Sequence, residues 1–106
     1  MPPENSAENE ILSVAIWKPA PGMESASLAT WRELTSILAK KGYGRDRLYR
    51  DRGGQFVLLR YWKSEDARRM AQEDPEMLRC WARLGNEIEI VKVYETLSAV
   101  GAEKTK

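Results

Sequence analysis

Two side chains able to bind or orient a ligand stand close together in the apolar run 55–63. Arg60 and Trp62 are two positions apart, so in a strand they would share one face with Leu58. A guanidinium among apolar neighbours can bind an anionic oxygen of a ligand, or it can pair with an aspartate or glutamate. A tryptophan at the end of a strand can lie against a flat aromatic ligand, or it can fill the core. Both interpretations stay open for each residue.

Two further tryptophans belong to expected helices. Trp31 and Trp81 recur with leucines at helical spacing, so they lie on apolar faces. Such positions usually fill a core, but aromatic side chains also form the apolar walls of small-molecule pockets. The candidate substrate-binding residues are therefore Trp62, Arg60, Trp31 and Trp81, and no residue is assigned as catalytic.

Histidine is absent from the chain, and cysteine occurs once. Histidine is the commonest metal ligand and the commonest general base in proteins. Cys80 has no second cysteine and no histidine to activate it or to share a metal with it, so a small buried hydrophobe is the simpler interpretation. The sequence predicts no metal site and no cofactor.

The charges of the chain are nearly balanced, with 17 lysines and arginines against 16 aspartates and glutamates. Nucleic-acid-binding domains usually carry a clear basic excess. The stretch 52–59 matches part of the RNA-recognition consensus, but it lacks the aromatic rings expected at Gly54 and Leu59. Base recognition on that fold depends on exposed rings, so no nucleic-acid partner is predicted. An RNA-binding module stays as the weaker competing interpretation.

The sequence shows no targeting or membrane signal. Residues 1–10 are polar, without the basic and apolar regions of a signal peptide. No apolar run approaches the roughly 20 residues that span a bilayer. We therefore expect a cytoplasmic protein with no membrane partner. The 106 residues suit one domain, expected at 10–97 between disordered tails at 1–9 and 98–106.

Four strands are expected within this domain. Apolar and β-branched residues predict them at 11–18, 45–52, 55–63 and 87–95. Gly53-Gly54 predicts a tight hairpin between the second strand and the third.

Two helices are expected between the strands. The first starts near Ser25, its expected cap, and stops at Gly42. The second starts at the cap Ser64, is interrupted near Pro75 and ends at Gly85. The resulting order, βαββαβ, predicts an α+β ferredoxin-like sandwich with its helices on one face of the sheet.

The strands are apolar on both faces. In the third strand, Leu58 and Trp62 alternate with Val57 and Leu59. In the last strand, Tyr94 is expected to share a face with the two isoleucines, opposite the valines. Strands that are apolar on both faces need cover on both faces. We therefore expect a homodimer, in which two copies pair their sheets as a dimeric α+β barrel.

The string Trp62-Lys63-Ser64-Glu65-Asp66-Ala67 follows the third strand. It is similar to the strand-ending tryptophan and Ser-Glu-x-Ala helix start of the antibiotic biosynthesis monooxygenase (ABM) family, within the dimeric α+β barrel superfamily. Pro21-Gly22 after the first strand and Asp74-Pro75 before the second helical piece also resemble that family. The resemblance covers roughly Ile11 to Leu97.

Members of this superfamily include cofactor-independent oxygenases of quinol substrates and haem-degrading enzymes. The tryptophan of the quinol-oxidising branch corresponds to Trp62, whereas the asparagine and tyrosine positions of that branch hold Leu58 and Arg68 here. The catalytic tryptophan and haem-ligating histidine of the other branch fall at Ala71 and Trp81. Haem-degrading activity is therefore not expected.

The resemblance implies a cofactor-independent monooxygenase that acts on a small aromatic substrate of the quinol or phenol type. A second hypothesis is a non-catalytic dimer that binds a small ligand or has a structural role. The two hypotheses differ in whether a bound aromatic ligand consumes oxygen.

Overall fold

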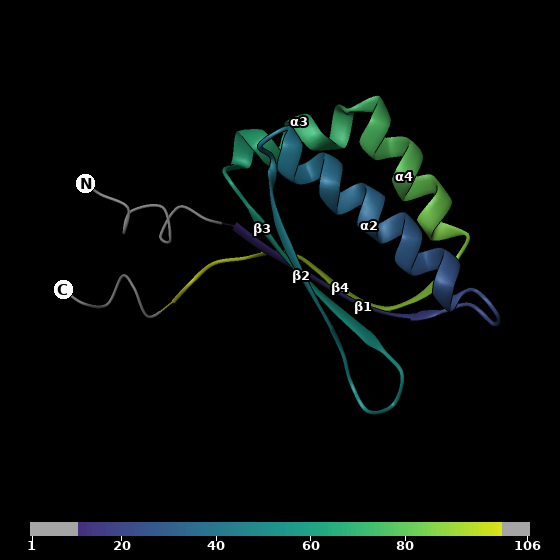
Figure 1. Ribbon diagram of the computed structural model, residues 1–106. Coiled ribbons are helices and arrows are strands. Elements are labelled where there is room, and N and C mark those ends of the chain that lie inside the picture. Colours follow the sequence, from purple (N-terminus) through teal and green to yellow (C-terminus); the bar gives the residue numbers. More distant parts are fainter. Residues whose placement is uncertain (1–10, 101–106) are drawn as a thin grey trace.

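The computed structural model describes residues 11–100, which Figure 1 draws in colour. Its elements, in chain order, are β1 (Ile11–Pro19), α2 (Glu24–Lys40), β2 (Gly44–Arg50), β3 (Phe56–Trp62), α3 (Glu65–Glu73), α4 (Pro75–Gly85) and β4 (Ile88–Leu97). This order confirms the expected α+β ferredoxin-like layout, with the second helix divided at Pro75 as predicted. The expected tail 1–9 lies outside the described residues, as do residues 101–106 of the other tail.

The sheet has the strand order β2-β3-β1-β4, and every neighbouring pair is antiparallel. Arg60 of β3 lies opposite Ser13 of β1 and opposite Asp46 of β2. Paired residues of antiparallel strands point to the same face of the sheet. Polar side chains of three strands therefore meet at one place in an otherwise apolar surface.

The helices lie together on one face of the sheet (Figure 1). The side chains between the two layers form a core cluster of Leu34, Leu38, Tyr43, Trp62, Ala67, Ala71, Met77 and Cys80. Cys80 is buried as predicted, and its burial raises the pKa of the thiol, which keeps it protonated. Within residues 11–100, no helix is long and apolar enough to cross a membrane.

No helix within the described part of the chain covers the other face of the sheet. On β3, the side chains of Val57, Leu59 and Tyr61 point to that face and stay partly exposed, while the residues between them are buried. We call this surface the open face; its apolar members are Leu12, Val14, Ile16, Tyr49, Val57, Leu59, Tyr61, Tyr94 and Leu97.

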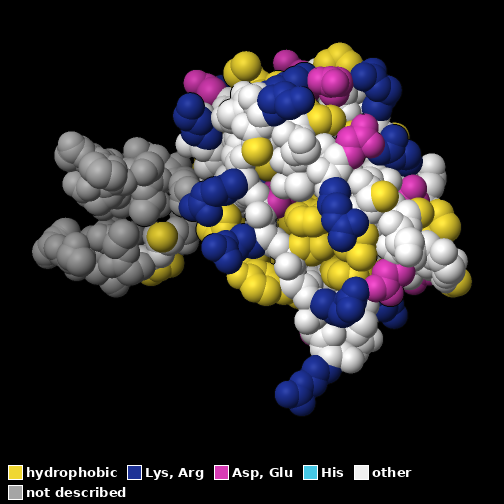
Figure 2. Space-filling view, in the orientation of Figure 1, with side chains coloured by type: hydrophobic (Ala, Val, Ile, Leu, Met, Phe, Trp, Pro, Cys, Tyr) yellow, Lys and Arg dark blue, Asp and Glu magenta, His cyan; other side chains and the backbone are white. Residues whose placement is uncertain are grey.

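Cationic side chains lie beside apolar and aromatic ones over the sheet. Figure 2 shows hydrophobic side chains gathered between the helical layer and the tip of the β2–β3 hairpin, with Lys and Arg side chains around them. On the open face, the Arg45 guanidinium lies 4.6 Å from the ring centroid of Tyr61. The Lys92 ammonium lies 5.3 Å from the ring of Tyr94. Cations in such positions interact favourably with aromatic faces.

The last strand differs from its prediction. The pairing of β4 with β1 shifts next to Trp17, where Val91 is an extra residue on β4. Such a bulge changes which of the following residues point to each face. Tyr94 therefore points to the open face and Val93 to the helical layer. The predicted grouping of Tyr94 with the isoleucines of this strand was wrong because simple alternation does not include the extra residue.

The helix starts also test the sequence predictions. Ser64 caps α3 as expected, because its Oγ accepts a hydrogen bond from the Ala67 backbone N–H at 3.0 Å. The expected cap at Ser25 was wrong. Helix α2 begins at Glu24, and the residue at its N-cap is Met23, whose side chain makes no capping bond.

Asp74 fixes the junction between α3 and α4. Its Oδ2 accepts hydrogen bonds from Lys41 Nζ at 2.8 Å and from Tyr43 Oη at 2.6 Å. Its Oδ1 accepts from the Glu76 backbone N–H at 2.9 Å and thereby caps α4. The bonds from Lys41 and Tyr43 hold the pKa of Asp74 well below its usual range. This junction determines where α4 begins, and so where Trp81 meets the sheet.

Candidate functional site

A cavity of about 440 Å³ lies between the sheet and the helices α3 and α4. Its sheet side is lined by the helix-facing residues Ser13, Ala15, Leu58, Arg60, Trp62, Val93 and Glu95, together with the intervening Val14, and its helix side by Arg68, Gln72, Leu78 and Trp81. The central helix-facing positions of β1 carry two small side chains, Ser13 and Ala15, and these leave the space unfilled. The volume lies within the usual range of small-molecule sites.

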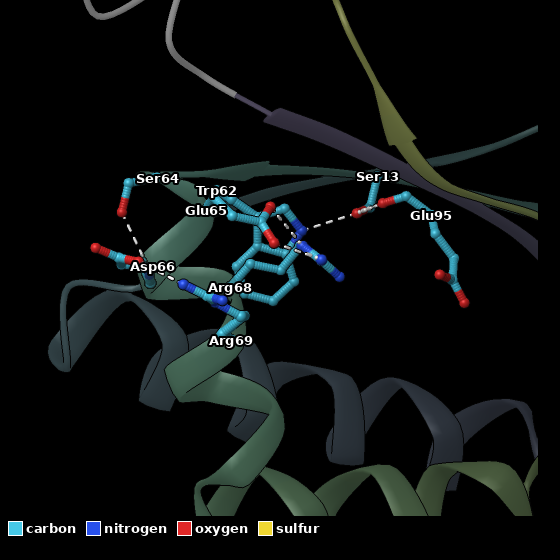
Figure 3. Close-up of polar contacts among 9 residues, drawn as sticks. Ser13, Trp62, Ser64, Glu65, Asp66, Arg68, Arg69 and Glu95 are labelled. Atoms are coloured by element: carbon cyan, nitrogen blue, oxygen red, sulfur yellow. Dashed lines mark hydrogen bonds and ion pairs between the residues drawn. The ribbon is translucent and has the colours of Figure 1, made fainter.

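Trp62 is held in one orientation by a chain of hydrogen bonds. Its indole Nε1 donates to Ser13 Oγ at 2.7 Å, and Ser13 Oγ donates to the backbone carbonyl of Glu95 at 2.5 Å. Figure 3 shows this chain running from β3 across β1 to β4. Because the buried indole N–H has a partner, the ring can form a cavity wall without leaving a polar atom unsatisfied.

Arg60 is a buried cation with a fixed partner. Its Nε and Nη2 donate to the two carboxylate oxygens of Asp46 at 2.7 and 2.8 Å. The exposed fractions of these two side chains are 7% and 0%. Trp31 Nε1 donates to the same carboxylate at 3.2 Å. A buried guanidinium needs such a partner, and the bidentate pairing of Arg60 with Asp46 supplies it.

One nitrogen of the Arg60 guanidinium is not used in this pairing. Nη1 of Arg60 makes no hydrogen bond within residues 11–100, and Arg60 lines the cavity wall. The guanidinium carbon lies 5.6 Å from the ring centroid of Trp62. A donor beside a flat aromatic wall suits an aromatic ligand that carries an oxygen atom.

Further charges reach the cavity from α3 and β4. Nε and Nη2 of Arg68 donate to the Glu65 carboxylate at 3.1 and 2.7 Å. Glu65, and then Glu95, raise the pKa of Arg68, which stays protonated. Glu95 supplies the carboxylate of the described lining. Nowhere in residues 11–100 do three or more His, Cys, Asp or Glu side chains form a group that could hold a metal ion.

Three of the four predicted substrate-binding residues meet in this cavity: Trp62, Arg60 and Trp81. Trp31 is not among the lining residues and contacts the site through its hydrogen bond to Asp46. Their role in ligand binding stays a prediction.

Sequence reasoning missed Ser13, Asp46 and Glu95. Ser13 carried a usable signal, because a serine in the middle of an apolar strand needs a reason. The pairing of Asp46 with Arg60 could be counted from the hairpin, given the register. Glu95 could not be placed, because the irregular register of β4 decides which way it points.

Phe56 bears on the RNA-binding interpretation. In an RNA-recognition module this position carries an exposed ring that stacks on a base. Here Phe56 is buried and stacks on Trp17, with ring centroids 4.7 Å apart and planes at 28°. Phe56 therefore does not offer its ring to a base on the open face.

Several solved structures share this fold. SnoaB, a cofactor-independent oxygenase from Streptomyces nogalater, aligns over 88% of this chain and 98% of its own, with a TM-score of 0.71 and 18% identity. A protein from Bacteroides thetaiotaomicron assigned as an antibiotic biosynthesis monooxygenase aligns over 94% and 99%, with a TM-score of 0.76 and 12% identity. A third, assigned likewise, comes from Chloroflexus aurantiacus and covers 87% and 95%, with a TM-score of 0.70 and 16% identity.

The chain therefore has an ABM-type α+β fold, as the resemblance in its sequence implied. At these identities the structural likeness shows the fold alone. No protein-family model matches the sequence, and no curated protein matches it significantly. Any activity must be argued from the cavity itself.

Proposed function

We propose that this protein is an ABM-like, cofactor-independent monooxygenase that acts on a small aromatic substrate of the quinol or phenol type. The observation that carries the proposal is the cavity, whose lining combines the Arg60 guanidinium, 5.6 Å from the ring centroid of Trp62, with a second indole from Trp81. The ABM-type fold, shared with a cofactor-independent oxygenase, supports the same class.

Such a reaction takes its electrons from the substrate. A deprotonated anthrone-type substrate transfers electrons to O₂, and one oxygen atom becomes a carbonyl on the substrate carbon. The other oxygen leaves as water, so a CH₂ group becomes C=O and no external reductant is required. The protein must hold the substrate, favour its anion and restrict water around it.

The lining offers a group for each of these tasks. Nη1 of Arg60 would donate to the substrate oxygen and favour its anionic form. Glu95 is the carboxylate of the lining and is the proposed proton acceptor. Trp62, fixed through Ser13, would hold the plane of the aromatic ring. Trp31 would not contact the substrate; it would position Arg60 through its hydrogen bond to Asp46.

Oxygen uptake tests this proposal directly. Anthrone and 1-naphthol are offered to the wild type and to Arg60→Lys, Glu95→Gln and Trp81→Leu, with oxygen and product followed together. Arg60→Lys keeps the cation that Asp46 needs but loses the second fork of donors, and turnover should fall about 10²-fold. Trp62 is left intact because it belongs to the core cluster, where truncation would disturb folding.

Met70→Leu is the matched control, because Met70 is exposed on α3 and lies outside the described lining. We expect one O₂ consumed for each quinone formed, and the Met70→Leu rate should equal that of the wild type. Oxygen consumption by the wild type no faster than in buffer would remove the oxygenase proposal. Equal rates in all variants would show that turnover does not depend on this cavity, and this result would also remove the oxygenase proposal.

A non-catalytic binding protein is the second candidate function. The Asp46–Arg60 pair supports it, because the carboxylate offsets most of the charge that would stabilise a substrate anion. The same cavity would then bind an aromatic ligand without oxidising it. Saturable binding of 1-naphthol with no oxygen uptake would favour this function.

We propose in addition that two copies of the chain pair their open faces. The apolar residues of this face come from all four strands, and no helix of the described chain covers them. A standard stable interface buries roughly 1,600 Å² in total. A second copy supplies an identical apolar surface for a symmetric contact, and the cavity stays on the far side of each sheet.

A further inference from the structure

A second, smaller cavity adjoins the first. It has a volume of about 190 Å³ and lies toward the C-terminal end of α4. Ala15, Leu58, Arg60 and Trp81 line both cavities, so these side chains alone form the boundary that the two share. The space between α4 and the sheet is thus divided into two lobes, which we call the polar lobe (440 Å³) and the apolar lobe (190 Å³).

The linings of the two lobes differ in chemistry. Besides the apolar Val14, Trp62, Leu78 and Val93, the polar lobe adds the polar side chains Ser13, Arg68, Gln72 and Glu95 to the shared residues. The apolar lobe adds Trp17, Leu84, Gly85, Ile88 and Ile90, none of which carries a charge. Arg60 is therefore the charged group at the boundary, and beyond it the wall is hydrocarbon and indole.

We propose that the apolar lobe is a second subsite, which binds an uncharged hydrocarbon substituent of the ligand whose oxygenated aromatic ring occupies the polar lobe. This second subsite rests on the proposed function in one respect: the oxygenated aromatic ring of the ligand is taken to bind in the polar lobe. The ligand is then a phenol or quinol with an apolar chain or ring on the side away from its oxygen, passing between Arg60 and Trp81.

The size of the lobe sets the size of the substituent. An apolar protein cavity of about 150 Å³ binds benzene, so the apolar lobe has room for about six carbon atoms. Burial of each methylene contributes about 0.8 kcal/mol, which is about a fourfold gain in affinity. A straight chain should therefore tighten binding steadily up to about six carbons and give no further gain beyond that length.

The probes are phenol and its 4-n-alkyl derivatives from ethyl to octyl. Their dissociation constants for the wild type are measured by titration calorimetry, and oxygen uptake is measured on the same samples. We expect about a fourfold fall in dissociation constant per methylene up to hexyl, and equal values for hexyl and octyl.

Two variants fill the lobe from different walls. Leu84→Phe enlarges a buried residue on the α4 side, and Ile90→Trp enlarges a residue on the strand side. Ala82→Leu makes the same kind of enlargement on the exposed side of α4, outside both linings. Both filled variants should lose the gain from chain length and still bind phenol as the wild type does. Ala82→Leu should keep the full gain.

The possible results separate the two proposals. If phenol binds but affinity is independent of chain length, or if both filled variants keep the full gain, the second subsite is overturned and the proposed function stands. If no phenol of any length binds, both proposals are overturned. If chain length raises affinity and filling abolishes that gain, the second subsite is supported, whether or not oxygen is consumed.

Discussion

The two faces of this sheet are built from the same strands, yet they are organised differently. On the face under the helices, β3 places Leu58, Arg60 and Trp62, and the two polar groups among them each have a bonded partner. On the open face, Val57, Leu59 and Tyr61 alternate with these residues, and apolar surface is left partly exposed. Both faces read as apolar in the sequence.

The two faces differ in how their polar and charged side chains are placed. Under the helices, polar side chains are buried in pairs that span neighbouring strands, such as Asp46 with Arg60. On the open face, the cations of Arg45 and Lys92 lie over aromatic rings near the water. The buried pairs of polar side chains under the helices leave a cavity with a defined hydrogen-bond donor. On the open face, the cations over aromatic rings border a surface that another protein can contact.

The largest expected effect comes from breaking the buried pair. Asp46→Asn removes the negative charge and leaves Arg60 buried without a counterion, which should lower the free energy of unfolding by about 3–5 kcal/mol. Denaturant unfolding followed by circular dichroism measures this change. The slope of the transition should stay constant if the fold is unchanged.

Glu24→Gln is the matched control for that experiment. Glu24 pairs with Arg50 at 2.6 Å, but both side chains are more than half exposed, at 53% and 55%. Loss of an exposed pair should change the free energy of unfolding by about 0–1 kcal/mol. Equal losses in the two variants would show that burial does not set the cost of breaking an ion pair in this protein.

The open face is tested by a charge at Val57. Val57 pairs with Ile16 on β1 and with Tyr49 on β2, so open-face residues flank it on both sides. Light scattering should report twice the chain mass of 12.1 kDa for the wild type. Val57→Asp buries an unpaired carboxylate in the proposed contact, and the dimer dissociation constant should rise at least about 10²-fold, or about 2.7 kcal/mol.

Met70→Asp adds the same charge to an exposed apolar position on α3. This variant should remain a dimer. A wild type that runs as a monomer at micromolar concentration would refute the pairing of open faces, and so would a Val57→Asp variant that stays dimeric.

A smaller effect is expected where a neutral hydrogen bond supports the cavity wall. Ser13→Ala removes the acceptor of the Trp62 indole N–H and should lower the free energy of unfolding by about 1–3 kcal/mol. The near-ultraviolet circular dichroism of the tryptophans should weaken as the ring gains freedom. Ser36→Ala, on the exposed side of α2, should change neither quantity appreciably. An unchanged spectrum in Ser13→Ala would show that packing alone orients Trp62.

The smallest expected effect is a dependence of stability on acid pH. Asp74 has a folded-state pKa well below the ordinary 3.8, chiefly because of Lys41 and then Tyr43. In the unfolded chain this group binds a proton near the ordinary value, so its contribution is fully present above about pH 4 and is lost as pH falls further. Asp74→Asn should flatten this loss in thermal unfolding between pH 5 and pH 2. An identical slope in both proteins would contradict the assignment.

The fold was predictable because local signals agreed with the tertiary ones. Ser64, Pro75 and Gly85 mark helix boundaries by their own backbone chemistry, and the structure places boundaries at or beside each of them. The position of the last strand was predicted, but the face to which Tyr94 points was not. The extra residue at Val91 breaks the simple alternation of side chains between the two faces. Pairing of the sheet with that of a second copy stays a prediction. Its basis is the same as in the sequence: the strands carry apolar residues on both faces.

The site was predictable only in part. Tryptophan is a residue type that often lines small-molecule sites, so Trp62 and Trp81 could be proposed as ligand-binding residues before their neighbours were known. Asp46 gives no such signal by its type, because an acidic residue in a basic, polar strand usually faces water; its pairing with Arg60 follows only once the hairpin register is known. The hollow itself depends on the small size of Ser13 and Ala15 relative to α4, and a strand pattern of apolar and polar residues does not encode volume.

The strand order has a consequence for aggregation. β4 forms one edge of the sheet, so its outward backbone N–H and C=O groups could template pairing with another chain. Glu89, Lys92 and Glu95 interrupt this ten-residue strand at every third position, and its irregular register distorts the edge. Charges and bulges are the usual protection against the edge-to-edge growth that leads to fibrils. A protein with an apolar sheet face can therefore remain selective for contact through that face while its edge resists open-ended assembly.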